Sequence, residues 1–280
     1  MKNTHPFIEV VLNGGLGNQL FGWAIGQSIA SLNGYNLILN SSQLVERQYE
    51  LSKFKISAVD CHPQQKKPYG SSRINRKLGR LIRPKLYEHE ELSFNFDNRF
   101  LKIPPNKTIY GYFQSWKYFK DCEIELRSFL LTNYIESKEY IKIKKEISGR
   151  EFIVIHVRRG DYVSKKNFHA LTSKEYYEQA LKQFKSSSGT LIVCFSDSID
   201  IAKNILPGCD YYFGPTDIND PAGILMIMSQ SKALIGSNST LSWWAAFLMD
   251  INADKIFPSI WFTKPKINID DLIPSTWKQI

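Results

Sequence analysis

The chain of 280 residues is 43% hydrophobic, which is enough for two ordinary domains that each bury a core of their own. Lys and Arg outnumber Asp and Glu by 36 to 27, so the expected partners are anionic: nucleic acid, a membrane surface or phosphorylated small molecules. The four cysteines are widely spaced and form no CxxC pair, which argues against a disulfide scaffold or a zinc site. Apolar segments fall short of the roughly 20 residues that span a bilayer, and the first residues are too polar for a signal peptide, so we expect a soluble protein of a reducing compartment.

The first half of the chain begins with a predicted strand, a glycine loop and a helix. The apolar segment 7–12 predicts the strand, and a helical pattern follows the sequence NGGLGN. Further strands are predicted at 36–40 and 108–113, and helical patterns cover 116–129 and 136–147. The pattern is weak through residues 41–106. Within that stretch, Lys66 to Lys85 is a basic run that is either a solvated surface or a contact for an anionic membrane or a phosphorylated acceptor.

The second half alternates regularly between strands and helices. Strands are predicted at 151–157, 190–196, 210–213, 232–237 and 255–258. Helices are predicted after a capping box that runs from Thr172 to Glu175, after Asp197, and over 222–230 and 241–248. Near-continuous apolar strands that alternate with helices indicate a parallel sheet covered on both faces. We therefore expect an α/β protein with two Rossmann-like domains facing a cleft, residues 1–148 and 149–280, and ligands at the carboxyl ends of the strands.

The loop after the first strand contains Gly14, Gly15 and Gly17, followed by Asn18. Glycines allow close backbone approach, and Asn18 is placed as the N-cap of the following helix, whose free N–H groups favour anions or hydroxyls. The loop matches neither GxGxxG nor a Walker loop. A structural turn and a binding loop therefore remain equally open.

The segment FIVIHVRRGDYV, residues 152–163, places charged residues directly after a buried strand. Alternation puts His156 and Arg158 on one face and Arg159 on the other, which predicts different roles for the two arginines. Arg158 beside His156 could grip a diphosphate, because a guanidinium fork matches phosphate oxygens. Arg159 could pair internally with Asp161. A purely structural ion pair at the strand end is the alternative.

Two more strand ends carry polar residues. Asp197 follows one of them, and Ser237, Asn238, Ser239 and Thr240 follow another at the start of a helix, where hydroxyls and N–H groups would form a second anion site. Trp243 and Trp244 are expected to serve helix packing rather than stacking on a ligand. Metal-binding motifs such as Asp-x-Asp and HExxH are absent from the sequence, so we expect no metal cofactor.

Five motifs in this order resemble the α-1,2-fucosyltransferases of glycosyltransferase family 11: GGLGNQLFGWA, GYFQSWKYF, HVRRGDY, EYYEQAL and GSNSTLSWWAAFL. The resemblance covers residues 8–262. It implies a GT-B-like fold and inverting, metal-independent transfer of L-fucose from GDP-fucose to the 2-hydroxyl of a terminal galactose, as in O-antigen synthesis. Its partners would be the nucleotide sugar and a galactose-terminated oligosaccharide, not nucleic acid.

The resemblance also assigns residues. It implies that Arg158 holds the donor β-phosphate, that His156 contacts the nucleotide, and that Ser239 and Thr240 contact the diphosphate. Asn18 falls near the transferred sugar and the acceptor, and we expect Gln19 and Gln114 on the same side.

The chain departs from the family at one position. Ile224 stands where the family usually has an acidic residue that related enzymes use against guanine, so guanine selectivity rests on another group, for which Asp220 is a candidate.

For the mechanism we expect a single displacement in which Arg158 stabilises charge on the leaving GDP. Asp161 is a candidate general base, although pairing with Arg159 is as good a role, and a phosphate oxygen could itself take the proton. The alternatives are a catalytically silent nucleotide-binding or phosphosugar-binding protein and a transferase for another nucleotide sugar, with an RNA-binding protein ranked last. We expect a bacterial-type cytoplasmic enzyme in peripheral contact with the inner membrane.

Overall fold

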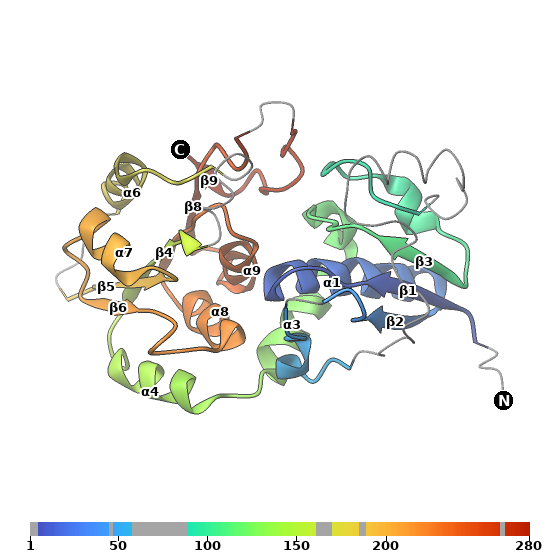
Figure 1. Ribbon diagram of the computed structural model, residues 1–280, viewed down its shortest axis with the longest axis horizontal. Helices are drawn as coiled ribbons and strands as arrows, with labels where there is room; N and C mark the ends of the chain where they lie inside the picture. The colour runs from blue at the N-terminus through green and yellow to red at the C-terminus, as the bar shows by residue number, and fades with distance from the viewer. Residues whose placement is uncertain (1–4, 45–46, 58–88, 161–169, 185–188, 264–266) are drawn as a thin grey trace. The chain divides into compact units, whose positions relative to one another are not determined.

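The computed structural model describes residues 5–44, 47–57, 89–160, 170–184, 189–263 and 267–280 (Figure 1). The chain divides into two compact units. The first unit is Met1–Leu126 with Asp270–Leu272, and the second unit is Arg127–Ile269 with Ile273–Ile280. Residues 127–148, which the sequence analysis placed with the first domain, thus group with the second unit. The basic run 66–85 and Asp161 lie outside the described residues.

The first unit is built on a three-stranded parallel sheet in the order β2-β1-β3. The strands are β1 (Phe7–Val11), β2 (Asn36–Asn40) and β3 (Lys107–Tyr110). β1 lies in the middle and is the most buried of the three, as its apolar sequence predicts. β3 ends earlier than the predicted strand 108–113, because the chain turns at Gly111 and Phe113 takes a positive φ of 50°.

Helix α1 (Leu16–Asn33) packs closely on this sheet. Gly22 and Gly26 face it, and a Cβ built on either would lie 2.9 Å or less from side chains of the sheet or its loops, so small residues are needed at this contact. The N-cap of α1 is Gly15, and the backbone N–H of Asn18 donates to the Gly15 carbonyl at 3.0 Å. The prediction of Asn18 as N-cap is therefore wrong, because the N-cap lies three residues earlier.

Short helical segments follow in the first unit: the 3-10 helices η1 (Leu51–Phe54), η3 (Asn98–Lys102), η4 (Trp116–Tyr118) and η5 (Lys120–Cys122). The predicted helix 116–129 is instead η4, η5 and then α3 (Glu123–Asn133), because Phe119 has non-helical dihedral angles. α4 (Lys138–Glu146) follows. Near the end of the chain, Asp271 returns to the first unit, where it accepts a hydrogen bond from the Phe96 N–H at 2.8 Å and forms an ion pair with Lys117.

The second unit contains a six-stranded parallel sheet in the order β6-β5-β4-β7-β8-β9. The strands are β4 (Phe152–Val157), β5 (Leu191–Ser196), β6 (Tyr211–Phe213), β7 (Ala233–Ile235), β8 (Asp254–Phe257) and β9 (Lys278–Gln279). Counted along the chain, this is the order 3-2-1-4-5-6 of a Rossmann fold. The direction of winding reverses between β4 and β7, so a ligand site is expected where these two strands end.

Helices cover both faces of this sheet (Figure 1). α6 (Lys174–Leu181) and α7 (Ile199–Ile205) share a core with Ile155 and Val157 of β4. On the opposite face, His156 meets α9 (Thr240–Leu248), and α8 (Pro221–Ser229) packs against α9. The N-cap of α6 is Ser173, one residue later than the predicted capping box, since its hydroxyl accepts the Tyr176 N–H.

The core of the second unit includes Trp243 and Trp244, both fully buried, which confirms that they serve helix packing. Their ring centroids are 5.3 Å apart in an edge-to-face arrangement, a favourable geometry for aromatic pairs. Within the described residues, none of the helices is long and apolar enough to cross a membrane.

Candidate functional site

The polar residues that follow β4, β5 and β7 gather at the carboxyl edge of the second sheet. β4 pairs with both β5 and β7, so the residues after all three strands meet at one place. Arg158 follows β4, Asp197 follows β5, and Ser237 and Ser239 follow β7. This place is the switch point of the winding, and it lies at the carboxyl ends of the strands, where the sequence predicts ligands.

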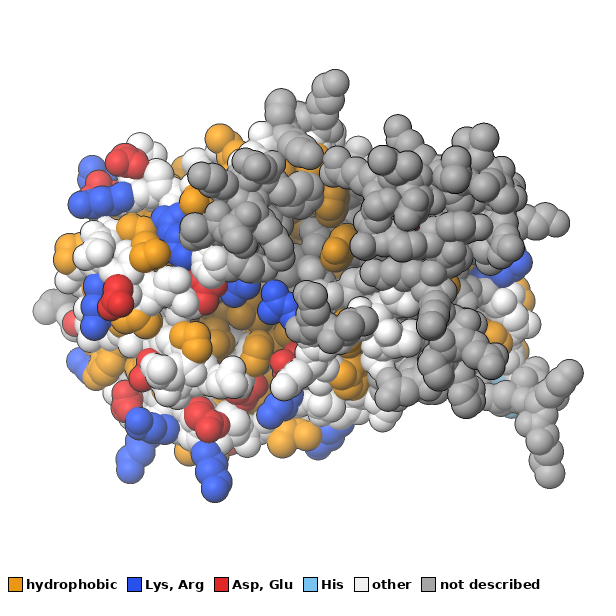
Figure 2. Space-filling view, viewed as in Figure 1, with side chains coloured by type: hydrophobic (Ala, Val, Ile, Leu, Met, Phe, Trp, Pro, Cys, Tyr) orange, Lys and Arg blue, Asp and Glu red, His pale blue; other side chains and the backbone are white. Residues whose placement is uncertain are grey.

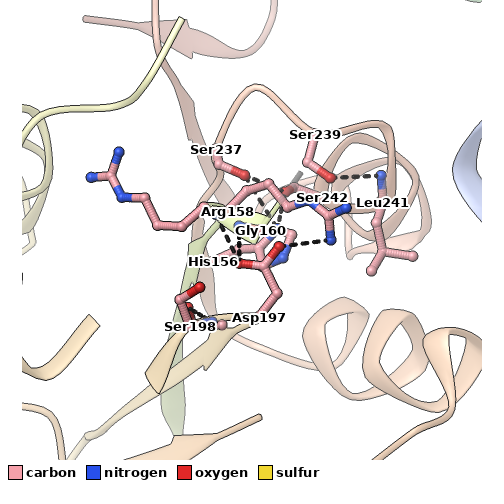
Figure 3. Close-up of polar contacts among 11 residues, drawn as sticks. His156, Arg158, Gly160, Asp197, Ser198, Ser237, Ser239, Leu241 and Ser242 are labelled. Carbon is pink, nitrogen blue, oxygen red and sulfur yellow. Dashed lines mark hydrogen bonds and ion pairs between the residues drawn. The ribbon is translucent and has the colours of Figure 1, made fainter. Parts of the chain in front are cut away.

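His156 points from β4 toward the start of α9 (Figure 3). Its Nδ1 contacts the Ser242 hydroxyl and lies 3.4 Å from the Ser237 hydroxyl. The ring is buried, and burial together with the Arg158 charge lowers the pKa of His156 to about 4, against a smaller opposing effect of Asp197. His156 is therefore neutral at pH 7 and acts as a hydrogen-bonding group rather than as a cation.

A second layer of hydroxyl groups holds the end of β4 in place. The Tyr177 hydroxyl donates to the His156 carbonyl at 3.1 Å and lies 2.7 Å from the Thr172 hydroxyl. Neither Ser242 nor Tyr177 was predicted at the site from the sequence. Ser242 could have been found, because it lies in the first turn of α9, three residues after the N-cap Ser239.

Asp197 organises the loop that follows β4. Its Oδ1 accepts hydrogen bonds from the backbone N–H groups of Arg159 and Gly160 at 2.8 and 3.0 Å. Its Oδ2 forms an ion pair with Nη1 of Arg158 at 3.0 Å (Figure 3). A Cβ on Gly160 would lie 2.4 Å from Oδ2, so a glycine is needed beside this carboxylate. Asp197 thus positions Arg158 and its loop, and its contact with the donor stays a prediction.

The two adjacent arginines lie in different environments, as strand alternation predicted. The side chain of Arg158 is 28% exposed beside Asp197. Arg159 is buried, and its Nη2 donates to the Thr172 carbonyl at 2.5 Å, so it ties the loop before α6 to the end of β4. Asp161, its predicted partner and the candidate base, lies outside the described residues. Arg158 is thus the guanidinium that can reach a ligand.

The four polar residues after β7 divide into a helix start and an anchor. Ser239 is the N-cap of α9, and its hydroxyl accepts the Leu241 N–H at 3.3 Å. Thr240 is the first helical residue and is half-buried. Asn238 is buried, and its amide donates to the carbonyls of Ala170 and Trp261 at 2.6 and 2.9 Å. Asn238 therefore fixes neighbouring loops, while Ser239 and Thr240 shape the helix N-terminus.

In the first unit, the residues predicted on the acceptor side also separate. The Gln114 amide donates to Oδ1 of Asn18 at 2.9 Å, so these two side chains form a pair. Gln19 is fully buried, and its amide bonds the Gly14 and Gln48 carbonyls and the Glu50 N–H at 2.9 to 3.0 Å. The Gln19 side chain is thus fully engaged in hydrogen bonds within the fold. Of the three residues predicted on the acceptor side, Asn18 and Gln114 are the two that bond to each other.

Asp220, the candidate to replace the missing acidic residue at Ile224, is occupied elsewhere. It is buried as the N-cap of α8, where Oδ1 accepts the Ala222 N–H at 3.1 Å. Its Oδ2 accepts the Tyr134 hydroxyl at 2.9 Å, and burial and the nearby carboxylate raise the pKa of Tyr134. Both oxygens therefore serve the helix start. Across the described ranges, no three His, Cys, Asp or Glu side chains converge to hold a metal ion.

Comparison with known proteins places this arrangement in a family. The chain matches the model of glycosyl transferase family 11 over residues 2–280. It is 26% identical to an alpha-1,2-colitosyltransferase of Escherichia coli over 96% of this chain and 97% of that protein. It is 24% identical to the galactoside 2-alpha-L-fucosyltransferase Sec1 of Mus musculus, over 85% of this chain and 63% of that protein.

A solved structure supports the fold. The α-1,6-fucosyltransferase NodZ, in a crystal soaked with GDP-fucose, superposes with a TM-score of 0.52 and 15% identity over 88% of this chain and 93% of its own. The predicted fold class, two Rossmann-like α/β domains of GT-B type, is confirmed. With the match over almost its whole length, the chain belongs to glycosyl transferase family 11 and is a glycosyltransferase.

Proposed function

We propose that this protein transfers L-fucose from GDP-fucose to the 2-hydroxyl of a terminal galactose on a surface oligosaccharide such as an O-antigen. The observation that carries the proposal is the placement of Arg158 and the N-terminus of α9 at the switch point of the second sheet. The motifs shared with α-1,2-fucosyltransferases support fucose as the sugar. The mouse relative, named for transfer to the 2-position of a galactoside, supports the acceptor.

The donor diphosphate is the group that this edge fits best. A guanidinium fork can bind two phosphate oxygens, and the free N–H groups of a helix N-terminus favour the same charge. Asp197 holds Arg158 in place, so little side-chain freedom is lost when the diphosphate binds. His156, neutral at pH 7, supplies hydrogen bonding beside Arg158 without adding a second charge.

The reaction is then a single displacement that inverts the anomeric centre. The acceptor 2-oxygen forms a bond to C1 of fucose as the bond from C1 to the β-phosphate oxygen breaks, and GDP leaves with the bonding electrons. Arg158 stabilises the negative charge that grows on that phosphate. The hydroxyl proton passes to a carboxylate, for which Asp161 is a candidate, or to the departing phosphate oxygen.

A second candidate is the transfer of colitose, which is L-fucose without its 3-hydroxyl group. The E. coli relative that is 26% identical is an alpha-1,2-colitosyltransferase, and its match covers almost the whole of both chains. The two candidates share the linkage and differ in one hydroxyl group of the donor.

A donor and acceptor panel tests the proposal. The purified protein is given GDP-fucose, nucleotide-activated colitose and a UDP-hexose, each with a galactose-terminated acceptor and with its 2-deoxygalactose analogue. We expect product from GDP-fucose with the first acceptor alone, since the analogue has no 2-hydroxyl group to attack. Preferred turnover of the colitose donor would establish the second candidate. Tight GDP binding without product from any donor would instead identify a silent nucleotide-binding protein.

The same proposal includes work at the inner face of the cytoplasmic membrane on a membrane-bound acceptor. The basic run 66–85 supports it, because clustered Lys and Arg attract anionic lipids. We expect the protein to sediment with vesicles that contain phosphatidylglycerol and to lose this binding at 0.5 M salt. The electrostatic attraction is screened beyond about 10 Å at 0.1 M salt and beyond about 3 Å at 1 M salt. Binding that is indifferent to salt would contradict it.

A further inference from the structure

The turn that follows β3 in the first unit is strained. It runs from Gly111 to Gln114, and Phe113 has a φ of 50°, which a bulky residue rarely adopts and which costs of order 1–3 kcal/mol. The Phe113 ring is fully buried, with centroids 5.0 Å from Phe100 and 5.8 Å from Tyr118. Packing of the ring is thus the first of two interactions that hold this backbone in place.

The second interaction is a pair of hydrogen bonds to Glu91. The backbone N–H groups of Tyr112 and Phe113 both donate to its Oε2, at 2.7 and 3.0 Å. The Glu91 N–H in turn donates to the Tyr110 carbonyl at 2.7 Å, so the residue is fixed beside the end of β3. One carboxylate oxygen therefore satisfies two donors of the strained turn, and the two hydrogen bonds are strongest when the group is ionised, above its raised pKa of about 7.

Gly111 leaves the space for this contact. A Cβ on Gly111 would lie 2.5 Å from the Cβ of Glu91 and 2.8 Å from its Oε2. The same Cβ would lie 2.9 Å from Cζ of Phe113, so a larger residue would push away the carboxylate and press on the Phe113 ring. This gives a way to displace Glu91 without changing it.

The turn ends at Gln114, which it directs to Asn18. The Gln114 amide donates to Oδ1 of Asn18 at 2.9 Å, and the Asn13 amide contacts the Gly111 carbonyl at 3.5 Å. Asn13 belongs to the glycine loop after β1 and Asn18 to the first turn of α1, so these contacts lie where the ends of β1 and β3 meet. In parallel sheets this carboxyl edge is where ligands bind.

We propose that Glu91 is a positioning residue for the acceptor: it fixes the strained Gly111–Gln114 turn, and through it the Gln114–Asn18 pair that faces the acceptor sugar. The proposal rests on the proposed function for the identity of the substrate. Glu91 acts through the turn and does not itself touch the reacting atoms.

Four variants of the full-length protein separate this role from others. Glu91→Gln keeps an oxygen that can accept the same two hydrogen bonds, whereas Glu91→Ala removes it. Gly111→Ala keeps the carboxylate and displaces it. Glu90→Gln is the matched control, because it makes the same charge change one residue away. For each variant we would measure kcat, KM for the acceptor, KM for GDP-fucose, GDP affinity by calorimetry, and hydrogen exchange of the Tyr112 and Phe113 amides.

We expect Glu91→Ala and Gly111→Ala to lower kcat/KM for the acceptor by about 10²-fold, the usual effect of a misplacement of about 1 Å. Both should expose the Tyr112 and Phe113 amides to exchange, while KM for the donor and GDP affinity stay near those of the wild type. Glu91→Gln should retain kcat/KM within about tenfold, since a neutral acceptor weakens the two hydrogen bonds without removing them. Glu90→Gln should match the wild type in every measurement.

Two results would overturn the proposal. Normal acceptor kcat/KM in Glu91→Ala would show that the turn does not depend on Glu91. If Glu91→Gln were as inactive as Glu91→Ala while its amides stayed protected, the carboxylate would act on the substrate directly. Failure of the wild type to transfer any sugar would count against the proposed function alone, because hydrogen exchange would still report whether Glu91 holds the turn.

Discussion

Arg158 and Arg159 are neighbours in the sequence, and the fold gives them separate tasks. Arg158 is partly exposed and paired with Asp197, whereas Arg159 is buried on the Thr172 carbonyl. We expect Arg158→Ala to lower kcat by at least about 10²-fold, as the loss of one group that stabilises a transition-state charge usually does. Steady-state kinetics with the preferred donor check this.

Arg158→Lys is the control for this prediction. Lysine keeps the positive charge but lacks the fork that binds two phosphate oxygens, so its kcat should fall between those of the wild type and the alanine variant. If Arg158→Ala turned over at nearly the wild-type rate, Arg158 would not be the group that stabilises the leaving phosphate. Equal loss of activity in the lysine and alanine variants would show that geometry matters more than charge.

Glu91 makes a second prediction at the scale of one residue, which concerns stability. Burial raises the pKa of Glu91 to about 7, although the N–H groups of Phe113 and Tyr112 lower it. A carboxyl group whose pKa is raised on folding stabilises the protein fully below its unfolded value, near 4.5, and loses that contribution as the pH rises through 7. The difference corresponds to at most about 3 kcal/mol.

The variant Glu91→Gln does not titrate and should escape this loss. Relative to the wild type, it should therefore be more stable at pH 8 than at pH 5, by up to the same amount. Urea unfolding at the two pH values measures the difference. A relative stability of the variant that does not change with pH would contradict the raised pKa.

At the scale of an element, Asp220 at the start of α8 is expected to contribute to stability and not to nucleotide recognition. Asp220 caps the helix and accepts the Tyr134 hydroxyl, so Asp220→Ala should cost about 1–2 kcal/mol of unfolding free energy. Asp220→Asn should cost less, because asparagine is also a good N-cap. Neither variant should change the ratio of GDP to UDP affinity, which calorimetry measures. A loss of the preference for GDP over UDP would show instead that Asp220 takes part in guanine recognition.

Most elements were predictable because their signals are local. Near-continuous apolar runs bounded by polar residues identified every strand of the second sheet except β9. β9 has only two residues, and its pairing with β8 depends on the tertiary fold rather than on a sequence pattern. The break between η4 and α3 was also missed, since the dihedral angles of Phe119 leave no signal in the hydrophobic periodicity.

The site was predictable in its position and less so in the task of each side chain. Strand ends placed Arg158, Asp197 and Ser239 together, because parallel strands bring their carboxyl ends to one edge. The sequence could not show that Asn238 would be used on two backbone carbonyls, because that depends on loops distant in the chain. Glu91 was missed for the same reason, since its partners lie about 20 residues later.

At the scale of the whole molecule, the two units should respond to acid in opposite ways. His156 in the second unit has its pKa lowered by burial, so its contribution to stability is present above about 6.5 and is lost as the pH falls toward 4. Glu91 in the first unit favours the folded state more as the pH falls. Acidification from pH 7 to pH 5 should therefore weaken the second unit relative to the first.

Hydrogen exchange read separately for β1 and β4 measures this difference. We expect protection of β4 to fall relative to β1 between pH 7 and pH 5, after correction for the intrinsic exchange rates. In His156→Gln, which does not titrate, the relative fall should be smaller. Parallel changes in both strands, unaffected by the substitution, would contradict the prediction.

The return of residues 270–272 to the first unit matters for anyone who wishes to exchange modules between glycosyltransferases. A chimera with a single junction after Leu126 would replace Asp271, the partner of the Phe96 N–H and of Lys117, along with the second unit. The first unit would then lose contacts that belong to its own fold. Grafting the second unit onto another first unit therefore requires three junctions, after residues 126, 269 and 272, so that the host keeps its own short returning segment.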